Sequence, residues 1–274
     1  MIIDSHVHFW KFDKKRDSWI TDNMKILRQD YLPEHLSLSL KRNSVDGCVA
    51  VQADPSELET HFLIELSKTH PEIKGVVGWI DLQNKNIKER LDYFSQFKII
   101  KGWRHIIQSE PENFLQDENF QRGIRELANY RYTYDILIYH DQLKQALEFV
   151  AKFPDQKFVL DHCAKPDIGN NKFEEWKLMI KEMSGYGYVY CKLSGLFTET
   201  KWKEWSAGDF YPYLDVVFES FGTDRLIFGS DWPVILLSGI YVQWKSLLEK
   251  YMEHYTEEER QKVFGLNAIE FYKL

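Results

Sequence analysis

The chain alternates eight times between a short apolar segment and a longer amphipathic one, and no other feature constrains its fold as tightly. The apolar segments are rich in valine, isoleucine and aromatic residues, which favour β-strands. They cover residues 1–8, 47–53, 75–81, 99–107, 134–140, 157–162, 188–194 and 226–230. Strands that alternate with helices pair in parallel through right-handed crossovers. The pattern therefore predicts a parallel sheet of eight strands.

The segments between the predicted strands have the spacing of amphipathic helices. They cover residues 56–69, 142–153, 173–183 and 215–221, and a final helix is expected to begin at Thr256 with a capping box. In the first of these helices, the buried face is expected to contain Leu58, Phe62, Ile64 and Leu66.

Eight such units in 274 residues match a (β/α)8 barrel, a fold of ~250 residues. No Pro-, Gly- or Ser-rich linker divides the chain, so we expect residues 1–274 to form a single TIM-like barrel domain. The alternative is an open, doubly wound sheet. The first strand is not followed by the glycine-rich turn that binds a nucleotide phosphate, which argues against a nucleotide cofactor.

Two connections are long and rich in aromatic residues. Residues 9–32 follow the first predicted strand, and residues 195–214 follow the seventh. Both leave the carboxyl ends of strands, where (β/α)8 barrels carry their active sites. We therefore expect both connections to overhang the mouth of the barrel as walls or lids.

The composition argues against several classes of partner. A net charge of −7 disfavours electrostatic binding of nucleic acid, and no apolar run approaches the length of a membrane span. The amino terminus lacks the basic region of a signal peptide. The three cysteines include no C-x-x-C pair, which fits free thiols in a reducing compartment. We therefore expect a cytoplasmic protein that binds neither nucleic acid nor membrane.

The first predicted strand ends in His6-Val7-His8. Alternate residues of a strand point to the same face, so the two imidazoles are expected side by side. Such a pair can bind a divalent metal, hold a carbonyl oxygen or transfer protons. His105, His140 and His162 also fall at or near the ends of predicted strands, which meet at one mouth in a barrel.

Asp231 follows the eighth predicted strand, and Pro233 is expected to prevent a helix directly after it. A carboxylate beside two or three imidazoles can be a metal ligand, a general base for water, or both. In isolation it could equally be a helix cap or an Asx-turn residue. The position of Asp231 next to His6 and His8 in a closed barrel favours the functional interpretation.

These motifs resemble the amidohydrolase superfamily and, within it, the branch that contains sugar lactonases for L-fucono- and L-rhamnono-lactones. The resemblance runs through residues 4–10, 101–105, 160–166, 192–196, 224–234 and 267–272. It implies that His6, His8, His162 and Asp231 occupy the metal-site and catalytic positions. The motifs are specific for the superfamily and the branch, but not for a substrate.

One departure from the family pattern concerns the metal. Members with two metals bridge them through a carboxylated lysine or a glutamate at the end of strand four. Here that end reads Trp103-Arg104-His105, and Lys101 lies too early in the strand to reach the mouth. The resemblance therefore implies one loosely bound zinc-like ion, or catalysis without a metal.

Several further candidates have both a functional and a structural interpretation. Arg104 either orients a substrate carbonyl or carboxylate or pairs with an acidic residue. His105 points the opposite way by strand parity, so one of the two is expected to face the site. Lys192 on strand seven is a candidate substrate contact, but so deep in a barrel it would need a partner.

The remaining candidates for substrate binding are His140, Trp10 and Trp19. The register of His140 at its strand end decides whether it faces the mouth. The two tryptophans would either stack on a sugar ring or pack within their own loop.

By the resemblance, the expected reaction is hydrolysis of a sugar aldonolactone, a small-molecule substrate. Asp231 would be the general base, and His6, His8 and His162 would polarise the carbonyl directly or through one metal, with help from Arg104. Two alternatives stay open. One is a metal-dependent decarboxylase or hydratase of an aromatic acid, and the other is a non-catalytic barrel that binds a sugar or a partner protein.

Overall fold

The computed structural model describes residues 1–169 and 173–274. Eight strands form one parallel sheet in which each strand pairs with its neighbour in sequence. The strands are β1 (Ile3–Val7), β2 (Gly47–Val51), β3 (Ile73–Gly78), β4 (Ile100–His105), β5 (Thr133–Ile136), β6 (Phe158–Leu160), β7 (Val189–Leu193) and β8 (Leu226–Phe228). The order matches the eight predicted strands.

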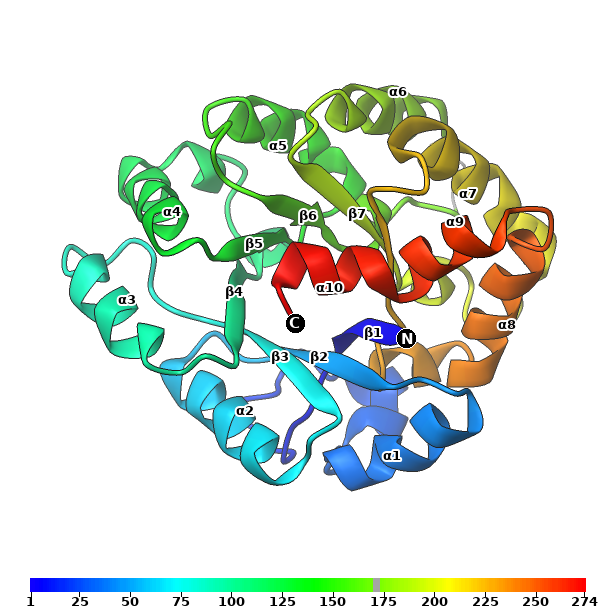
Figure 1. The fold of residues 1–274 in the computed structure, drawn as a ribbon, viewed down its shortest axis with the longest axis horizontal. Helices are drawn as coiled ribbons and strands as arrows, with labels where there is room; N and C mark the ends of the chain where they lie inside the picture. Colours follow the sequence, from blue (N-terminus) through cyan, green and yellow to red (C-terminus); the bar gives the residue numbers. More distant parts are fainter. Residues whose placement is uncertain (170–172) are drawn as a thin grey trace.

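The sheet closes on itself where the chain leaves β8. Val7 forms a parallel bridge with Trp232, the His8 amide donates to the Trp232 carbonyl at 2.7 Å, and the Asp231 amide donates to the His6 carbonyl at 2.9 Å. The helices surround the strands (Figure 1). The prediction of a (β/α)8 barrel is therefore confirmed, and the open-sheet alternative is wrong.

The helices of the described residues follow the strands in order. They are α1 (Pro33–Arg42), α2 (Glu57–Thr69), α3 (Ile87–Ser95), α4 (Glu118–Tyr130), α5 (Leu143–Val150), α6 (Phe173–Ser184), α7 (Ala207–Phe221), α8 (Tyr241–Tyr251), α9 (Glu257–Gln261) and α10 (Asn267–Tyr272). Short 3-10 segments are η1 (Asp22–Leu27), η2 (Ile107–Ser109), η3 (Phe114–Gln116), η4 (His140–Gln142), η5 (Asp161–Ala164), η6 (Leu196–Glu199) and η7 (Val234–Leu237), and the π-helical turn η8 (Lys262–Leu266) joins α9 to α10. Within this part of the chain, no helix combines the length and the apolarity needed to span a bilayer.

The strands end earlier than predicted, and this difference shapes the site. His8, His140, His162 and Asp231 all lie just past the hydrogen-bonded strands. His162 and Asp231 have φ angles of 54° and 60°, which extended backbone cannot adopt. The backbone of the loops, rather than the hydrogen bonds between the strands, therefore positions these candidate side chains.

An irregularity in β1 turns its histidines toward the barrel interior. The pairing of β1 with β2 shifts register between Asp4 and Val7. Ile3 packs with Val49, Val51 and other strand residues that fill the inside of the barrel. Val7 instead packs in the second core, between the outer face of the sheet and the helices. Simple alternation from Ile3 would direct His6 outward, so the irregularity redirects it inward, as bulges commonly do.

Three helical predictions need correction. Leu58 is 81% exposed, so this part of the predicted face is wrong, whereas Ile64 is buried as predicted and Leu63 is buried in addition, beside Thr60. The Thr60 hydroxyl binds both the amide and the carbonyl of Trp79, which rotates this face toward the end of β3. The helical turn η7 follows Pro233 directly, because Pro233 occupies its N-cap, where the helix needs no proline N–H.

The third correction concerns the connection after β7, which ends at the N-cap Ser206 because α7 already begins at Ala207. The loop after β1 is as long as predicted. It is secured by contacts among aromatic rings, in which Tyr31 packs edge-on against Trp10 at 5.5 Å and against Trp232 at 5.2 Å. The β1 loop is therefore held as a packed aromatic segment against the end of β8.

The carboxyl-terminal segment closes the opposite end of the barrel. As predicted, Thr256 caps the segment and forms a capping box with Glu259. Figure 1 shows α10 crossing the centre of the ring of strands, next to both chain termini. Phe271 and Tyr272 of α10 pack with interior residues of the strands. The helix α10 thus covers the end of the barrel opposite the mouth, where the candidate site residues lie.

Candidate active site

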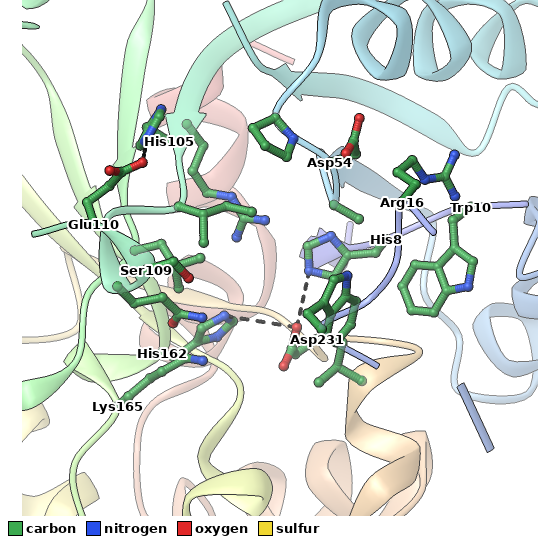
Figure 2. Close-up of a pocket in the computed structure, with 18 residues that line it drawn as sticks. His8, Trp10, Arg16, Asp54, His105, Ser109, Glu110, His162, Lys165 and Asp231 are labelled. Carbon is green, nitrogen blue, oxygen red and sulfur yellow. Dashed lines mark hydrogen bonds and ion pairs between the residues drawn. The ribbon is translucent and has the colours of Figure 1, made fainter. Parts of the chain in front are cut away.

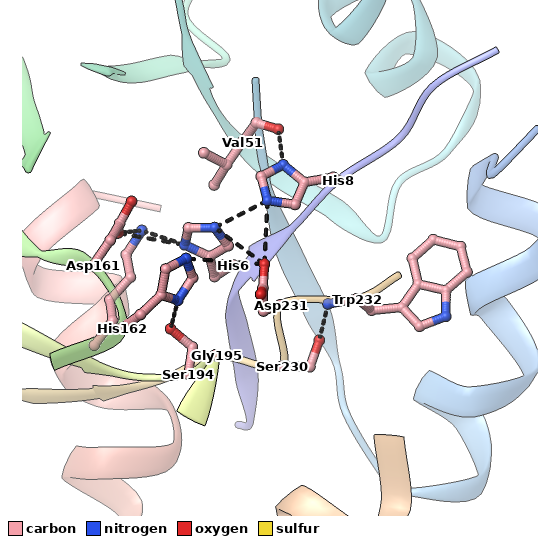
Figure 3. A network of polar contacts seen from close by, with 12 residues as sticks. His6, His8, Val51, Asp161, His162, Ser194, Gly195, Ser230, Asp231 and Trp232 are labelled. Atoms are coloured by element: carbon pink, nitrogen blue, oxygen red, sulfur yellow. Dashed lines mark hydrogen bonds and ion pairs between the residues drawn. The ribbon is translucent and has the colours of Figure 1, made fainter. Parts of the chain in front are cut away.

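His6, His8 and Asp231 bring three donor atoms together at the mouth (Figure 3). The Nε2 atoms of His6 and His8 lie 3.2 Å apart. Asp231 Oδ1 lies 3.3 Å from His8 Nε2 and 3.8 Å from His6 Nε2. All three residues are buried. The structure therefore places together the residues that the first strand and the end of the eighth were predicted to supply.

The backbone around Asp231 is held in an unusual conformation. Asp231 has a φ of 60°, a conformation that costs a non-glycine residue on the order of 1 kcal/mol. Its amide donates to the His6 carbonyl, and the next amide, of Trp232, donates to the Ser230 hydroxyl at 3.0 Å. The Ser230 amide in turn donates to the buried Asp4 carboxylate at 2.9 Å. These bonds keep the Asp231 carboxylate turned toward the histidines.

The tautomer of His8 follows from its partner. Its Nδ1 lies 2.8 Å from the carbonyl oxygen of Val51, which can only accept a hydrogen bond. His8 therefore carries a proton on Nδ1, and its Nε2 is directed to the mouth. A backbone carbonyl behind Nδ1 is the usual support of a histidine that binds a metal.

His162 reaches the mouth from a left-handed turn. Residues 162–165 all have positive φ angles, between 46° and 58°. His162 Nδ1 lies 2.8 Å from the Ser194 hydroxyl, and Nε2 lies 3.9 Å from Asp231 Oδ1. Gly195, with a φ of 69°, leaves room for the ring, because a Cβ there would lie 2.5 Å from His162 Nδ1.

The buried environment sets the charges of these groups. Burial lowers the pKa of His162 to about 4, and burial together with the Lys192 ammonium holds the pKa of His6 well below its usual value. Burial alone would raise the pKa of Asp231, but its interactions with His162, His8 and His6 outweigh burial and lower it. At neutral pH the site therefore holds an ionised carboxylate beside the neutral imidazoles of His6 and His162.

A network of buried charges lies behind the histidines. Lys192 Nζ is 2.5 Å from Asp135 Oδ2 and 2.9 Å from Asp161 Oδ1. Arg104 Nη1 donates to Asp161 Oδ2 at 3.0 Å, and Arg104 also donates to the Gln52 carbonyl. Tyr272 from α10 donates to Asp135 Oδ2 at 2.9 Å. Each buried cation thus has a carboxylate partner, which is the condition for keeping charges in a core.

Asp135 and Asp161 are site residues that the sequence interpretation missed. Each is a carboxylate in or directly after an apolar strand, the same signal that identified Asp231. The neighbours of Asp161 settle its charge: burial by itself would raise its pKa, but the charge of Lys192, the contact with His6 and the charge of Arg104 hold that pKa well below its usual value. For Asp135 burial prevails and raises the pKa to about 6 despite Lys192.

The structure places Lys192 behind the cavity rather than on its wall. Its side chain is fully buried beneath His6 and lies outside the lining of the cavity. The predicted need for a partner is met by Asp135 and Asp161. Arg104 combines both of its predicted interpretations, since it pairs with Asp161 and also lines the cavity.

A cavity of about 300 Å³ opens above the donor atoms (Figure 2). His8, His162, Asp231 and Arg104 contribute to its lining. The polar residues of its walls include Arg16, Asp54, Ser109, Glu110 and Lys165. Sequence reasoning did not identify these wall residues, because loop residues carry no periodic signal.

The remaining candidates differ in how they relate to the cavity. His105 lines it together with Arg104, so the expectation that only one of them faces the site is wrong. His105 is held there by Glu110 at 2.8 Å and by the Trp79 indole N–H at 3.1 Å. His140 lies outside the lining, because its Nδ1 turns to the Lys165 carbonyl at 3.3 Å.

Both tryptophan candidates line the cavity, but they differ in exposure. Trp10 is 2% exposed and packs edge-on against Trp19 and Tyr31, and its indole N–H donates to the Gln29 carbonyl. Trp19 is 42% exposed. Loop packing therefore accounts for Trp10, whereas Trp19 has a free face beside the mouth.

The donor atoms of His6, His8 and Asp231 fit one divalent metal. A tetrahedral zinc with bonds of about 2.0–2.2 Å places its ligand atoms roughly 3.3–3.6 Å apart. The observed separations of 3.2, 3.3 and 3.8 Å bracket this range. A second group of donors, formed by His6, Asp161 and His162, is a weaker candidate, because both Asp161 oxygens already contact cations.

Comparison with known proteins agrees with this architecture. A family model described as amidohydrolase matches residues 3–274. L-fucono-1,5-lactonase of Burkholderia multivorans is 36% identical over 284 residues, which cover 99% of this chain and 96% of that enzyme. L-rhamnono-gamma-lactonase of Scheffersomyces stipitis is 28% identical over 66% of this chain and 61% of its own length.

A solved structure agrees with the whole fold. The crystal structure of an amidohydrolase from Burkholderia multivorans with bound zinc superposes with a TM-score of 0.96 at 35% identity, and the alignment covers all of this chain and 99% of the other. The chain therefore belongs to the amidohydrolase family.

Proposed function

We propose that this protein hydrolyses a sugar aldonolactone, with an L-fucono-1,5-lactone-like ring as the first candidate. The observation that carries the proposal is the ionised Asp231 carboxylate, held beside the His6 and His8 rings where it lines a cavity of about 300 Å³. A cavity of this volume lies at the small end of ligand sites and suits a single sugar ring. The similarity to enzymes named as lactonases over nearly the full chain supports the substrate class.

Asp231 is the proposed general base. A water molecule between Asp231 and the lactone carbonyl would lose its proton to the carboxylate as its oxygen attacks the carbonyl carbon. The low pKa of Asp231 keeps the carboxylate available in its ionised form at neutral pH. The left-handed backbone at Asp231 fixes the direction of the carboxylate toward the cavity.

Arg104 and His162 are the proposed donors to the oxyanion. Arg104 lines the cavity with a guanidinium group, which donates hydrogen bonds and carries positive charge. If the Ser194 hydroxyl donates to His162 Nδ1, the His162 proton resides on Nε2 and points toward Asp231 and the substrate. A divalent ion bound by His6, His8 and Asp231 would polarise the carbonyl and acidify the water.

Ring opening completes the proposed reaction. The tetrahedral intermediate collapses as the carbon–oxygen bond of the ring breaks, and protonated Asp231 returns its proton to the departing ring oxygen. The product is an aldonic acid, which ionises to a carboxylate. Arg104 and Lys165 line the cavity and supply positive charge for this anion.

The test is acid release from a panel of aldono-1,4- and 1,5-lactones, followed with a pH indicator for the parent and for Asp231→Asn. The asparagine keeps the shape of the side chain but cannot accept the proton, so we expect kcat/KM to fall by about 10²–10⁴-fold. Matching thermal unfolding curves would show that the variant is folded. Parent turnover no faster than spontaneous hydrolysis on every lactone would contradict the proposal and direct attention to aromatic acids.

A further inference from the structure

One wall of the cavity carries two hydrogen-bond acceptors that have no donor. Gln108, Ser109 and Glu110, in the segment around η2, all line the cavity. Gln108 Oε1 is buried and has no hydrogen-bond partner among the described residues. Glu110 Oε1 is bound by His105, but the second carboxylate oxygen has no donor in this part of the chain. A buried acceptor costs free energy unless a donor reaches it, so this wall suits a ligand that donates hydrogen bonds.

The position of Glu110 is fixed by two hydrogen bonds in series. The Trp79 indole N–H, which can only donate, lies 3.1 Å from His105 Nδ1. His105 Nδ1 is therefore an acceptor, and the ring carries its proton on Nε2. That nitrogen lies 2.8 Å from Glu110 Oε1 and donates to it. The His105 ring also stacks on Phe114, with ring centres 4.7 Å apart, which holds the plane of the ring.

The backbone of this wall is held independently of these side chains. The Gln108 amide donates to the Leu137 carbonyl at 3.1 Å, and the Gln142 side chain donates to the Ile107 carbonyl at 3.2 Å. The Ile107 side chain is buried. A wall that is already ordered loses little conformational entropy when a ligand binds, which is the property of a preformed specificity site.

Glu110 lies nearer the rim of the cavity than Asp231, because their side chains are 32% and 6% exposed. Figure 2 shows Glu110 and His105 on one side of the cavity, and Arg16 and Trp10 on the other. A ring whose carbonyl reaches Asp231 would therefore present a part remote from the carbonyl to Glu110. On a sugar lactone that part carries hydroxyl groups, which donate hydrogen bonds, whereas Glu110 would repel a carboxylate placed there.

We propose that Gln108 and Glu110 form the hydroxyl-binding wall of the site, where each accepts a hydrogen bond from a ring hydroxyl of a neutral sugar lactone, and that His105 positions Glu110. This role rests on the proposed lactone hydrolysis and adds to it the groups that select the substrate. A site built to bind a hydroxyl rejects analogues that lack it, because its acceptor is then left unpaired. The wall therefore favours a polyhydroxylated lactone over an aromatic acid.

The first test measures binding without turnover. L-Fucose has a hydroxylated pyranose ring without a ring carbonyl, and calorimetric titration gives its Kd for the parent, Gln108→Met and Glu110→Met. Methionine keeps the length of both side chains and removes their acceptors. We expect the Kd to rise by about 3–10-fold for Gln108→Met and by about 10–100-fold for Glu110→Met, because the second variant loses a charged acceptor.

A matched control is Glu112→Met on the same connection. Glu112 lies outside the lining of the cavity and accepts a hydrogen bond from the Gln145 side chain at 3.0 Å, so its loss should leave the Kd unchanged. Equal affinities of the parent, Gln108→Met and Glu110→Met for L-fucose would overturn the proposal, and so would a parent that does not bind L-fucose.

A second test separates hydroxyl recognition from catalysis. δ-Valerolactone is a 1,5-lactone without hydroxyl groups. Glu110→Met should lower kcat/KM on the preferred aldonolactone by about 10–100-fold but change kcat/KM on δ-valerolactone by less than about 2-fold. An equal fall on both lactones would contradict the proposal, since the hydroxyl groups would then make no difference to the effect of Glu110.

The positioning role of His105 is tested by a pair of variants. His105→Phe keeps a ring to stack on Phe114 but loses the donor to Glu110, whereas His105→Gln retains a side-chain N–H. We expect His105→Phe to weaken L-fucose binding by about 3–10-fold and His105→Gln to restore most of it. Equal losses in both variants would reject the positioning role. L-Fucose binding with this pattern, but without turnover of any lactone, would contradict the proposed hydrolysis and leave the hydroxyl-binding wall supported.

Discussion

Asp231 owes its chemistry to its surroundings rather than to its residue type alone. A buried carboxylate would ordinarily take up a proton, but three imidazoles beside Asp231 hold its pKa below the usual range. Its left-handed backbone adds strain, and the hydrogen bonds of residues 230–232 hold the backbone in this conformation. The same carboxylate is a candidate metal ligand and the proposed general base, so Asp231→Asn is the substitution that should affect both properties.

Gly195→Ala should damage the site more than the fold. The added methyl group would lie 2.5 Å from His162 Nδ1, and Ala is disfavoured at a φ of 69°. We expect kcat/KM on the preferred lactone to fall by at least 10-fold, because the His162 ring must move, while unfolding free energy falls by about 1–2 kcal/mol. Steady-state kinetics and urea unfolding measure the two effects. Unchanged kinetics would show that the position of His162 is unimportant.

Glu59→Gln should remove the part of the pH dependence of folding stability that comes from the Glu59 carboxyl group. Burial raises the pKa of Glu59 from its unperturbed value of 4.5 to about 7. The hydrogen bond from the Ala53 amide and the charge of Arg16 oppose this rise but do not cancel it. Between these values the folded chain holds a proton that the unfolded chain has released, so the parent loses stability as the pH rises through this window.

As the pH rises from about 5 to about 8, the free energy of unfolding of the parent should therefore fall, relative to that of the glutamine variant, by on the order of 3 kcal/mol. Urea unfolding of both proteins at the two pH values measures the difference. Both proteins share every other titrating group, so the comparison isolates Glu59. An equal stability difference at both pH values would contradict the prediction.

At the scale of the elements, α10 connects the floor of the barrel to the active site. Its Tyr272 reaches the Asp135 carboxylate, Asp135 binds Lys192, and Lys192 contacts His6. The periodic apolar pattern of the chain predicted a final helix, but it did not predict that this helix would supply a polar group to the interior. The reason is that the partner of Tyr272 lies 137 residues away in sequence.

Tyr272→Phe should lower the free energy of unfolding by about 1.5–3 kcal/mol, because it removes a hydrogen bond to a buried carboxyl group. Urea unfolding measures the change. Tyr190→Phe is the control, since the Tyr190 ring packs against Phe271 of the same helix, and it should change stability by less than about 0.5 kcal/mol. Equal effects of the two substitutions would show that the hydroxyl of Tyr272 contributes nothing specific.

At the scale of the whole molecule, the site lies on the seam of the barrel. His6 and His8 belong to the first strand and its end, and Asp231 follows the last strand. The two ends are already joined by backbone hydrogen bonds, and the charge network behind them pairs every buried cation with a carboxylate. The fold therefore needs no metal to close, although a metal would join its first and last strands.

Zinc should stabilise the protein without being required for folding. After treatment with a chelator we expect a cooperative thermal transition. Added zinc should then raise the stability by about 2.7 kcal/mol at a free concentration 100 times its Kd. Differential scanning calorimetry measures the shift, and Asp231→Asn should abolish most of it. Loss of the folded state on chelation would contradict this view of the seam.

The sequence by itself determined the architecture and part of the site. Eight apolar segments separated by amphipathic ones specify a parallel barrel, because strand and helix periodicity are local properties of the chain. The candidate residues His6, His8, His162 and Asp231 could be named for a related reason: the ends of parallel strands meet at one mouth, whatever their separation in sequence. The exact strand ends were not predictable, since they depend on the left-handed turns at His162 and Asp231.

Only the tertiary structure decided how these groups are charged and which atoms they present. Lys192 and His6 are 186 residues apart, and Asp161 and Arg104 are 57 apart, so no local pattern could reveal that they touch. The walls of the cavity come from loops whose residues repeat at no period. Tautomers and pKa values depend on the few atoms within about 4 Å of a group, and those atoms are assembled by folding.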